Sequence, residues 1–191
     1  MNPSISIFIV NYNTGSLLKR CLRSIFDTKD DLTLELFVAD NNSTDESCTI
    51  VKRLFPEVAL TEYSRNEGYT KAMNSLLSKA RGTYCLLLHP DVELLPRTLK
   101  EFVNFFELHA DAGILGANLY YPDGTPNPCE VLWPGFKNDL LCFAVRLFKR
   151  IPVGNKLVGN YSPMEWSHKY TSVVPSVWNA CMMVRREVCL F

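Results

Sequence analysis

Four short apolar runs, each followed by a polar loop, constrain the fold of this chain more than any other feature. The runs have the length and composition of buried strands and cover residues 5–10, 34–39, 58–63 and 83–88. Apolar residues at helical spacing predict helices over 16–26, 69–80 and 96–109, and one that ends at Phe55. This alternation predicts an α/β fold with a mostly parallel sheet and helices on both faces.

The later part of the chain has weaker signals. A fifth strand is expected over 113–120 and a further one over 174–185. Between them, residues 133–152 combine apolar side chains with basic ones such as Arg146 and Lys149. Two interpretations of this segment stay open, namely a surface helix that packs on the domain and an amphipathic segment that lies on an anionic membrane surface.

Length and charge argue against several classes of protein. With 191 residues the chain is long enough for one domain with a buried core. Its 20 basic residues balance 20 acidic ones, so we expect no nucleic-acid partner. The sequence has no run of about 18 apolar residues, so no transmembrane helix is predicted. The seven cysteines form no C-x-x-C pair, and we interpret them as reduced thiols in a reducing compartment.

Polar loops follow the predicted strands, and in parallel sheets ligands bind outside the carboxyl ends of the strands. Asp40 heads an Asx-rich loop, where it can bind a nucleobase or ribose or else cap the next helix. Asp91 follows the most apolar run and can hold a hard divalent cation, or again cap a helix. His89 is either a second metal ligand or a hydrogen-bonded loop histidine.

Other motifs are weaker or missing from the sequence. Asn66 and Gly68 indicate a turn, and Lys71 is placed to pair with Glu67 one helical turn away. The sequence contains no P-loop and no G-x-G-x-x-G after the first run, which argues against a P-loop NTPase and a dinucleotide oxidoreductase. It also lacks the G-x-S-x-G and H-E-x-x-H motifs of hydrolases and metalloproteases.

Taken together, the loops resemble those of family-two glycosyltransferases with the GT-A, Rossmann-like fold. The resemblance rests on Phe8–Asn13, Val38–Asp45, Asn66–Gly68 and Leu86–Val92, with a later match over Ala180–Val188. The first four occur in the family's order and spacing and cover roughly residues 5–120. The sequence is most similar to the rhamnosyltransferase-like branch, which builds bacterial surface polysaccharides.

The resemblance implies a set of donor-binding residues, namely Val10, Asn11, Tyr12, Asp40, Asn66, Gly68, His89 and Asp91. In this set Asp40 would bond to the nucleobase. His89 and Asp91 would take the first and last positions of the D-x-D-type motif and hold Mg²⁺ or Mn²⁺ against the donor diphosphate. His89 departs from the family, which commonly has Asp or Asn at that position.

The resemblance also implies the reaction and its setting. A UDP- or dTDP-sugar would donate its sugar, with inversion, to a saccharide or lipid-linked saccharide acceptor in cell-wall polysaccharide synthesis. We expect a cytoplasmic location at the inner face of the cell membrane, with residues 133–152 as the peripheral membrane contact. Residues 1–120 would form the donor-binding region and 121–191 the start of an incomplete acceptor region, within a single domain.

No catalytic base is assigned. The family's base lies in a Glu-Asp-type motif, which would fall beyond Phe191, so we expect a chain truncated at its C-terminus. One alternative is a non-catalytic remnant that binds a nucleotide-sugar but lacks the base. Another is a sugar nucleotidyltransferase, although the chain lacks the Gly-rich loop expected after the first strand.

Overall fold

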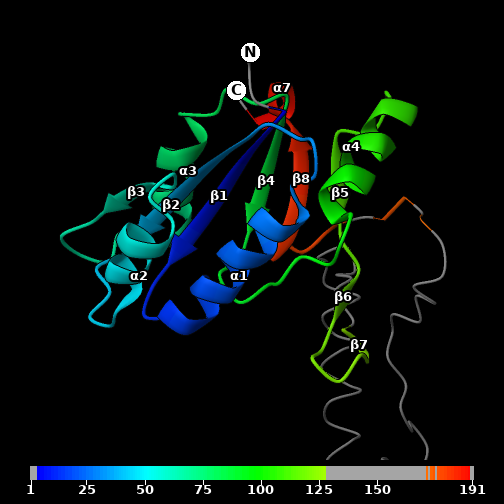
Figure 1. Cartoon of the computed structure of the whole chain (residues 1–191). Helices are drawn as coiled ribbons and strands as arrows, with labels where there is room; N and C mark the ends of the chain where they lie inside the picture. Colours follow the sequence, from blue (N-terminus) through cyan, green and yellow to red (C-terminus); the bar gives the residue numbers. More distant parts are fainter. Residues whose placement is uncertain (1–3, 128–170, 172, 175, 190–191) are drawn as a thin grey trace, which may run out of the picture. The chain divides into compact units, whose positions relative to one another are not determined.

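The computed structural model describes residues 4–127, 171, 173–174 and 176–189 (Figure 1). The chain divides into two compact units. The first comprises Met1–Gly116 and Asn179–Phe191, and the second comprises Ala117–Trp178. The predicted functional boundary at residue 120 stays a prediction, as does the assignment of residues 121–191 to an acceptor region. The predicted membrane segment 133–152 lies outside the described residues.

A six-stranded sheet, ordered β3-β2-β1-β4-β8-β5, forms the centre of the first unit. The strands are β1 Ile5–Asn11, β2 Leu34–Asp40, β3 Ala59–Glu62, β4 Tyr84–Leu88, β5 Ile114–Gly116 and β8 Cys181–Arg185. β1 is parallel to β2 and β4, and β2 is parallel to β3, whereas β8 is antiparallel to both β4 and β5. The predicted mostly parallel α/β fold is confirmed.

Helices cover both faces of this sheet, as predicted. They are α1 Gly15–Thr28, α2 Ser47–Leu54, α3 Tyr69–Leu77, α4 Thr98–Leu108 and α7 Arg186–Cys189. Figure 1 shows α1 and α2 on one face and α3 on the other. Because both faces are covered, every residue of β1 and β4 is buried. None of the helices in the described part of the chain is long and apolar enough to cross a membrane.

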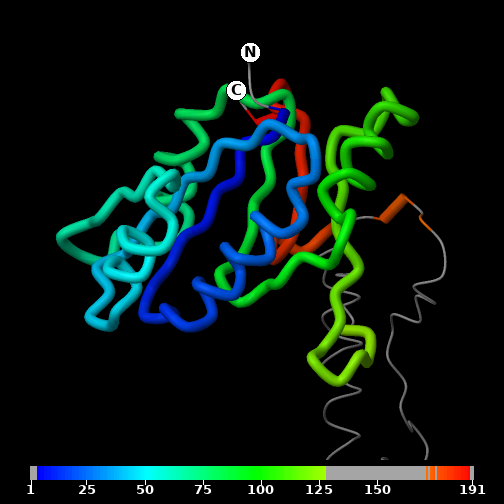
Figure 2. Tube along the Cα trace, viewed as in Figure 1, coloured from blue at the N-terminus to red at the C-terminus, as the bar shows by residue number. Residues whose placement is uncertain are grey.

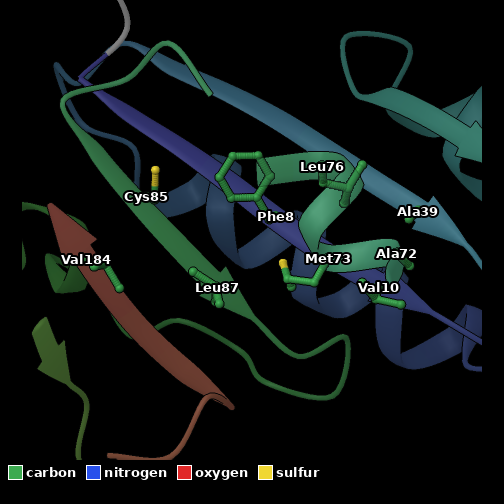
Figure 3. Close-up of a cluster of buried hydrophobic side chains, with 9 residues drawn as sticks. All are labelled: Phe8, Val10, Ala39, Ala72, Met73, Leu76, Cys85, Leu87 and Val184. Atoms are coloured by element: carbon green, nitrogen blue, oxygen red, sulfur yellow. The ribbon is translucent and has the colours of Figure 1, made fainter. Parts of the chain in front are cut away.

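The core beneath α3 joins four strands to that helix (Figure 3). Its buried members are Phe8, Val10, Ala39, Ala72, Met73, Leu76, Cys85, Leu87 and Val184. The side chains from β1 and β4 alternate, because successive residues of a strand point to opposite faces. This core fixes α3 over β1 and β2, and it thereby places the start of α3 at the edge where both strands end.

Two predicted strands differ from the structure. The strand expected over 113–120 is wrong as one element, because β5 ends at Gly116 and the next strand belongs to another sheet. That sheet is a hairpin of β6, Leu119–Tyr120, and β7, Pro126–Asn127, in the second unit. Of the strand expected over 174–185, only Cys181–Arg185, which is β8, is a strand among the described residues. β8 is as short as its partner β4, and pairing begins where Cys181 meets Leu88.

Candidate functional site

The carboxyl ends of β1, β2 and β4 meet at one edge of the sheet. The chain runs outward from β1 to β2 and β3, and then returns to place β4 on the other side of β1. The position between β1 and β4 is therefore the topological switch point, where open α/β sheets bind ligands. The loops that follow Asn11, Asp40 and Leu88 lie at this edge.

Asn11 and Asp40 form the buried centre of the edge. They are register partners at the ends of β1 and β2, and their exposed fractions are 0% and 2%. Asn11 Nδ2 donates to Asp40 Oδ1 at 2.8 Å. The backbone N–H of Ser43 donates to Asp40 Oδ2 at 2.8 Å, and the Ser43 hydroxyl donates to Oδ1 at 2.7 Å. The carboxylate therefore accepts three hydrogen bonds from its own loop and strand neighbour, as a buried charge requires.

Reciprocal hydrogen bonds join the loop after β1 to the loop after β2. The backbone N–H of Asn13 donates to Ser43 Oγ at 2.8 Å, and that of Thr44 donates to Asn13 Oδ1 at 2.7 Å. Asn13 and Asn42 both have positive φ angles, of 53° and 67°, which asparagine tolerates better than most residues. The two loops thus form one polar platform, on which the Tyr12 side chain remains half exposed.

Asp45 links the first turns of two helices to this platform. Its Oδ2 accepts the Gly15 N–H of α1 at 2.9 Å, and its Oδ1 accepts the Ser47 N–H of α2 at 3.0 Å. Burial raises the pKa of the Asp45 carboxyl, but the hydrogen bonds from Ser47 and Gly15 outweigh this effect and lower it. Thr14 is the N-cap residue of α1 but makes no side-chain capping bond, because its hydroxyl donates to Asn11 Oδ1 at 2.6 Å.

The loop before α3 forms the next part of the edge. Asn66 Oδ1 accepts the Gly68 N–H at 2.9 Å, and Gly68 has a φ of 80°, a conformation that favours glycine. The Glu67 N–H lies 3.4 Å from Asn41 Oδ1, which links this loop to the loop after β2. The predicted pair of Glu67 with Lys71 is confirmed. The predicted donor-binding set did not include Asn41, a buried amide directly after Asp40.

His89 lies at the end of β4, on the side of the sheet covered by α3. Cys85 and Leu87 point into the core beneath α3, and His89 continues this alternation. Its ring centroid lies 5.5 Å from that of Tyr69, the first residue of α3. Its backbone N–H donates to the carbonyl of Ala180 at 2.9 Å. Its Nε2 is buried and has no hydrogen-bond partner among the described residues.

Asp91 differs from Asp40 in its exposure. It is exposed in a short turn that the Val92 N–H closes on the His89 carbonyl at 3.2 Å. The turn lies near α1, because the Cys21 thiol of that helix donates to the His89 carbonyl at 3.6 Å. The Asp91 carboxylate is therefore available to a ligand, whereas the Asp40 carboxylate is already hydrogen-bonded.

Comparison with known proteins identifies the family of this chain. Residues 6–189 match the family described as "Glycosyl transferase family 2". The chain belongs to that family. The finding confirms the resemblance at the level of the family. The rhamnosyltransferase-like branch is a finer assignment and stays a prediction.

Curated proteins are similar to the chain over different lengths. The O-antigen biosynthesis protein RfbC of Myxococcus xanthus is 26% identical over 97% of this chain and 14% of its own length. A GalNAc(5)-diNAcBac-PP-undecaprenol beta-1,3-glucosyltransferase of Campylobacter jejuni is 30% identical over 51% of this chain and 32% of its own length. The chain thus spans about a third or less of these relatives.

Solved structures share the fold. S. aureus TarS in complex with UDP-GlcNAc superposes with a TM-score of 0.56 at 24% identity, over 68% of this chain and 40% of that one. The mannosyltransferase PcManGT from Pyrobaculum calidifontis, in complex with GDP-Man and Mn²⁺, gives 0.55 at 25% identity, over 64% and 37%. These likenesses support the GT-A architecture predicted from the sequence.

The polar side chains at this edge fit a divalent cation in only one way. The described residues contain no group of three or more His, Cys, Asp and Glu side chains that could hold a metal ion. Mg²⁺, however, is often bound by one or two carboxylates together with substrate phosphates. The exposed Asp91 fits that mode. The buried Nε2 of His89 does not face solvent, so the predicted ligand role of His89 gains no support from this nitrogen.

Proposed function

We propose that this chain binds a nucleotide-sugar at the carboxyl ends of β1, β2 and β4 and serves the transfer of its sugar to a saccharide or lipid-linked saccharide. The observation that carries the proposal is the polar platform at the switch point. It combines internally bonded loops with exposed side chains that have no role in the core. Membership of glycosyl transferase family 2 supports the reaction class.

The platform suggests a division of labour among the predicted donor-binding residues. Val10, Asn11 and Asp40 are buried, and we assign them to holding the loops in place. The exposed Tyr12 can also contact the nucleobase, because its ring can stack on a base. This role is additional to a bond between Asp40 and the base, which stays a prediction.

The diphosphate would lie between the end of β4 and the start of α3. The Asn66 and Gly68 loop presents the N-terminus of α3 there, and helix N-termini favour anionic groups. Asp91 would hold Mg²⁺ or Mn²⁺ against the diphosphate, and such an ion offsets the negative charge that develops on the leaving group. His89 would position Tyr69 through their ring contact.

The reaction we propose is a direct displacement at the anomeric carbon. The acceptor oxygen forms a bond to this carbon as the bond to the phosphate oxygen breaks, and the electron pair leaves with the nucleoside diphosphate. Attack from the opposite face inverts the configuration. The acceptor proton passes to a base, and we assign this role to none of the described residues.

The finer assignments rest on the sequence resemblance and on what the relatives are named for. We propose a hexosyl or rhamnosyl donor carried on UDP or dTDP, and an acceptor in surface or cell-wall polysaccharide synthesis. The name of the Campylobacter jejuni relative specifies an undecaprenol-linked saccharide. An acceptor of that kind would place the chain at the cytoplasmic membrane face, with residues 133–152 as the contact.

Calorimetric titration with UDP and dTDP, in Mn²⁺ and in EDTA, tests the proposal. We expect Mn²⁺ to strengthen nucleotide binding by the wild-type chain, and Asp91→Ala to weaken Mn²⁺-dependent binding by about tenfold or more. Glu93→Ala is the matched control, since Glu93 is an exposed carboxylate of the same loop that pairs with Arg20 at 3.1 Å. Equal loss in both variants would refute the role of Asp91.

A further inference from the structure

A pair of thiols lies at the opposite edge of the sheet from the proposed donor site. The short helix α7 sits beside the amino end of β4 (Figure 2), where the Arg186 N–H donates to the Thr83 carbonyl at 3.1 Å. Cys189 of α7 packs against the core cluster that contains Cys85 of β4. A hydrogen bond between the two thiols is the largest effect on the pKa of each. Residues distant in sequence thus bring the two thiols together beside one core cluster.

The two thiols differ in exposure and in acidity. Cys85 is fully buried, whereas Cys189 is half-buried. The hydrogen bond from Cys85 lowers the pKa of the Cys189 thiol, although burial opposes the shift. The same hydrogen bond and burial raise the pKa of the Cys85 thiol, on which the charges of Arg186 and Glu35 have smaller, opposite effects. Cys189 therefore ionises more readily than Cys85, and the thiolate is the reactive form of cysteine.

The other described cysteines lack this combination. Cys48 is also half-buried, but burial and the neighbouring Asp40 raise the pKa of its thiol to about 12. Cys21 and Cys181 are fully buried, and burial raises the pKa of both thiols. Among the described cysteines, partial exposure, a lowered pKa and a contacting thiol coincide only at Cys189.

We propose that Cys189 is a modification site for small-molecule disulfides and that Cys85 resolves the adduct to an intramolecular disulfide. In the first step the Cys189 thiolate attacks one sulfur of the reagent, and the other sulfur leaves as a thiolate that takes up a proton. In the second step the Cys85 sulfur attacks Cys189 and expels the second reagent thiol, which takes the Cys85 proton. The protein loses two hydrogens and the reagent gains them as two thiols.

The geometry favours the second step. Cys85 is fully buried and Cys189 is half-buried, so a group attached at Cys189 can lie toward solvent and be released there. The bond formed would tie α7 to β4 and would close a loop that contains all of the second unit, Ala117–Trp178. Closing so long a loop restricts the unfolded chain and resists detachment of α7.

Oxidised glutathione and mass spectrometry of the intact, folded chain test this proposal. We expect the wild-type chain to lose about 2 Da and to yield a peptide linked through Cys85 and Cys189. Cys85→Ala should stop at the mixed disulfide, with one glutathionyl group on Cys189. Cys189→Ser should give neither product, and Cys48→Ser, the matched control at a half-buried thiol, should behave as the wild type.

The proposal is overturned if Cys189 stays unmodified in the wild-type chain, or if the wild type stops at the mixed disulfide as Cys85→Ala does. A peptide that links either residue to Cys129 or Cys142, which lie outside the described residues, would equally contradict it. Because Cys189 lies half exposed in a four-residue helix, Cys189→Ser is expected to fold. The result at Cys189 therefore does not depend on tolerance of a substitution at the buried Cys85.

Discussion

Asn11 and Asp40 end two neighbouring parallel strands, and the side-chain nitrogen of Asn11 lies 2.8 Å from Asp40 Oδ1. This hydrogen bond is the buried base of the polar platform. Ser43 adds a backbone and a hydroxyl donor to the same carboxylate. The strand ends and the loop therefore depend on one another, and a change at Asp40 acts first on the fold of the edge.

Asp40→Asn is predicted to destabilise the chain. An asparagine amide keeps the shape but turns one acceptor oxygen into a donor, which must then face a donor from Asn11 or Ser43. We expect a loss of about 1–3 kcal/mol in the free energy of unfolding, measured by urea denaturation. Asp111→Asn, at an exposed aspartate, is the control and should change this free energy by less than about 0.5 kcal/mol. Equal stability of the two variants would contradict the account.

Gly15→Ala is predicted to separate the first turns of α1 and α2. A Cβ at this position would lie 3.1 Å from the Ser47 backbone nitrogen and 3.2 Å from Asp45 Oδ2. Relieving these contacts must weaken the hydrogen bonds that Asp45 accepts, and we expect a cost of about 1–3 kcal/mol in thermal or urea unfolding. Ser16→Ala, at the exposed neighbouring position, should leave the midpoint almost unchanged. A Gly15→Ala chain as stable as Ser16→Ala would be the opposite result.

Glu35 is predicted to make stability depend on pH. Burial raises the pKa of its carboxyl, but hydrogen bonds from Ser6 and Arg81 outweigh this and place it below the usual value of 4.5. A carboxyl with a lower pKa in the folded state stabilises the fold above its unfolded pKa, and this contribution is lost as pH falls through the folded pKa. Stability should thus decline below about pH 5.

Urea unfolding at a series of pH values measures this effect. Glu35→Gln cannot ionise, so its stability should decline less steeply than that of the wild type as the solution is acidified. Glu57→Gln removes an exposed surface carboxylate and should keep the wild-type slope. If all three chains show the same slope, Glu35 does not contribute to acid sensitivity.

The two central strands were predictable because each is a dense apolar run that is buried on both faces of the sheet. The run over 5–10 became β1, and the run over 83–88 became β4, within about one residue. Prediction failed where pairing with a neighbouring strand, rather than local sequence, sets the length of a strand. β8 is limited to five residues by its partner β4, and no local signal in 174–185 reveals that limit.

The candidate site was predicted in position but not in detail. Polar residues after apolar runs correctly placed the loops at one edge, because parallel strands end together. The bond from Asp45 to Ser47 of α2 is local, but its bond to Gly15 of α1 spans thirty residues, and no sequence pattern reports it. The same holds for Asn41, which only the fold brings to Glu67.

The central claim is that a nucleotide binds at the carboxyl edge of the sheet. Chemical-shift mapping of the ¹⁵N-labelled chain, titrated with UDP and with dTDP in Mg²⁺, tests it most directly. The account predicts that the largest shifts fall at residues 11–15, 41–45, 66–69 and 89–92. It also predicts small shifts at the amino edge, at 81–83 and 186–189. Shifts concentrated at the amino edge, or none with either nucleotide at saturating concentration, would contradict it.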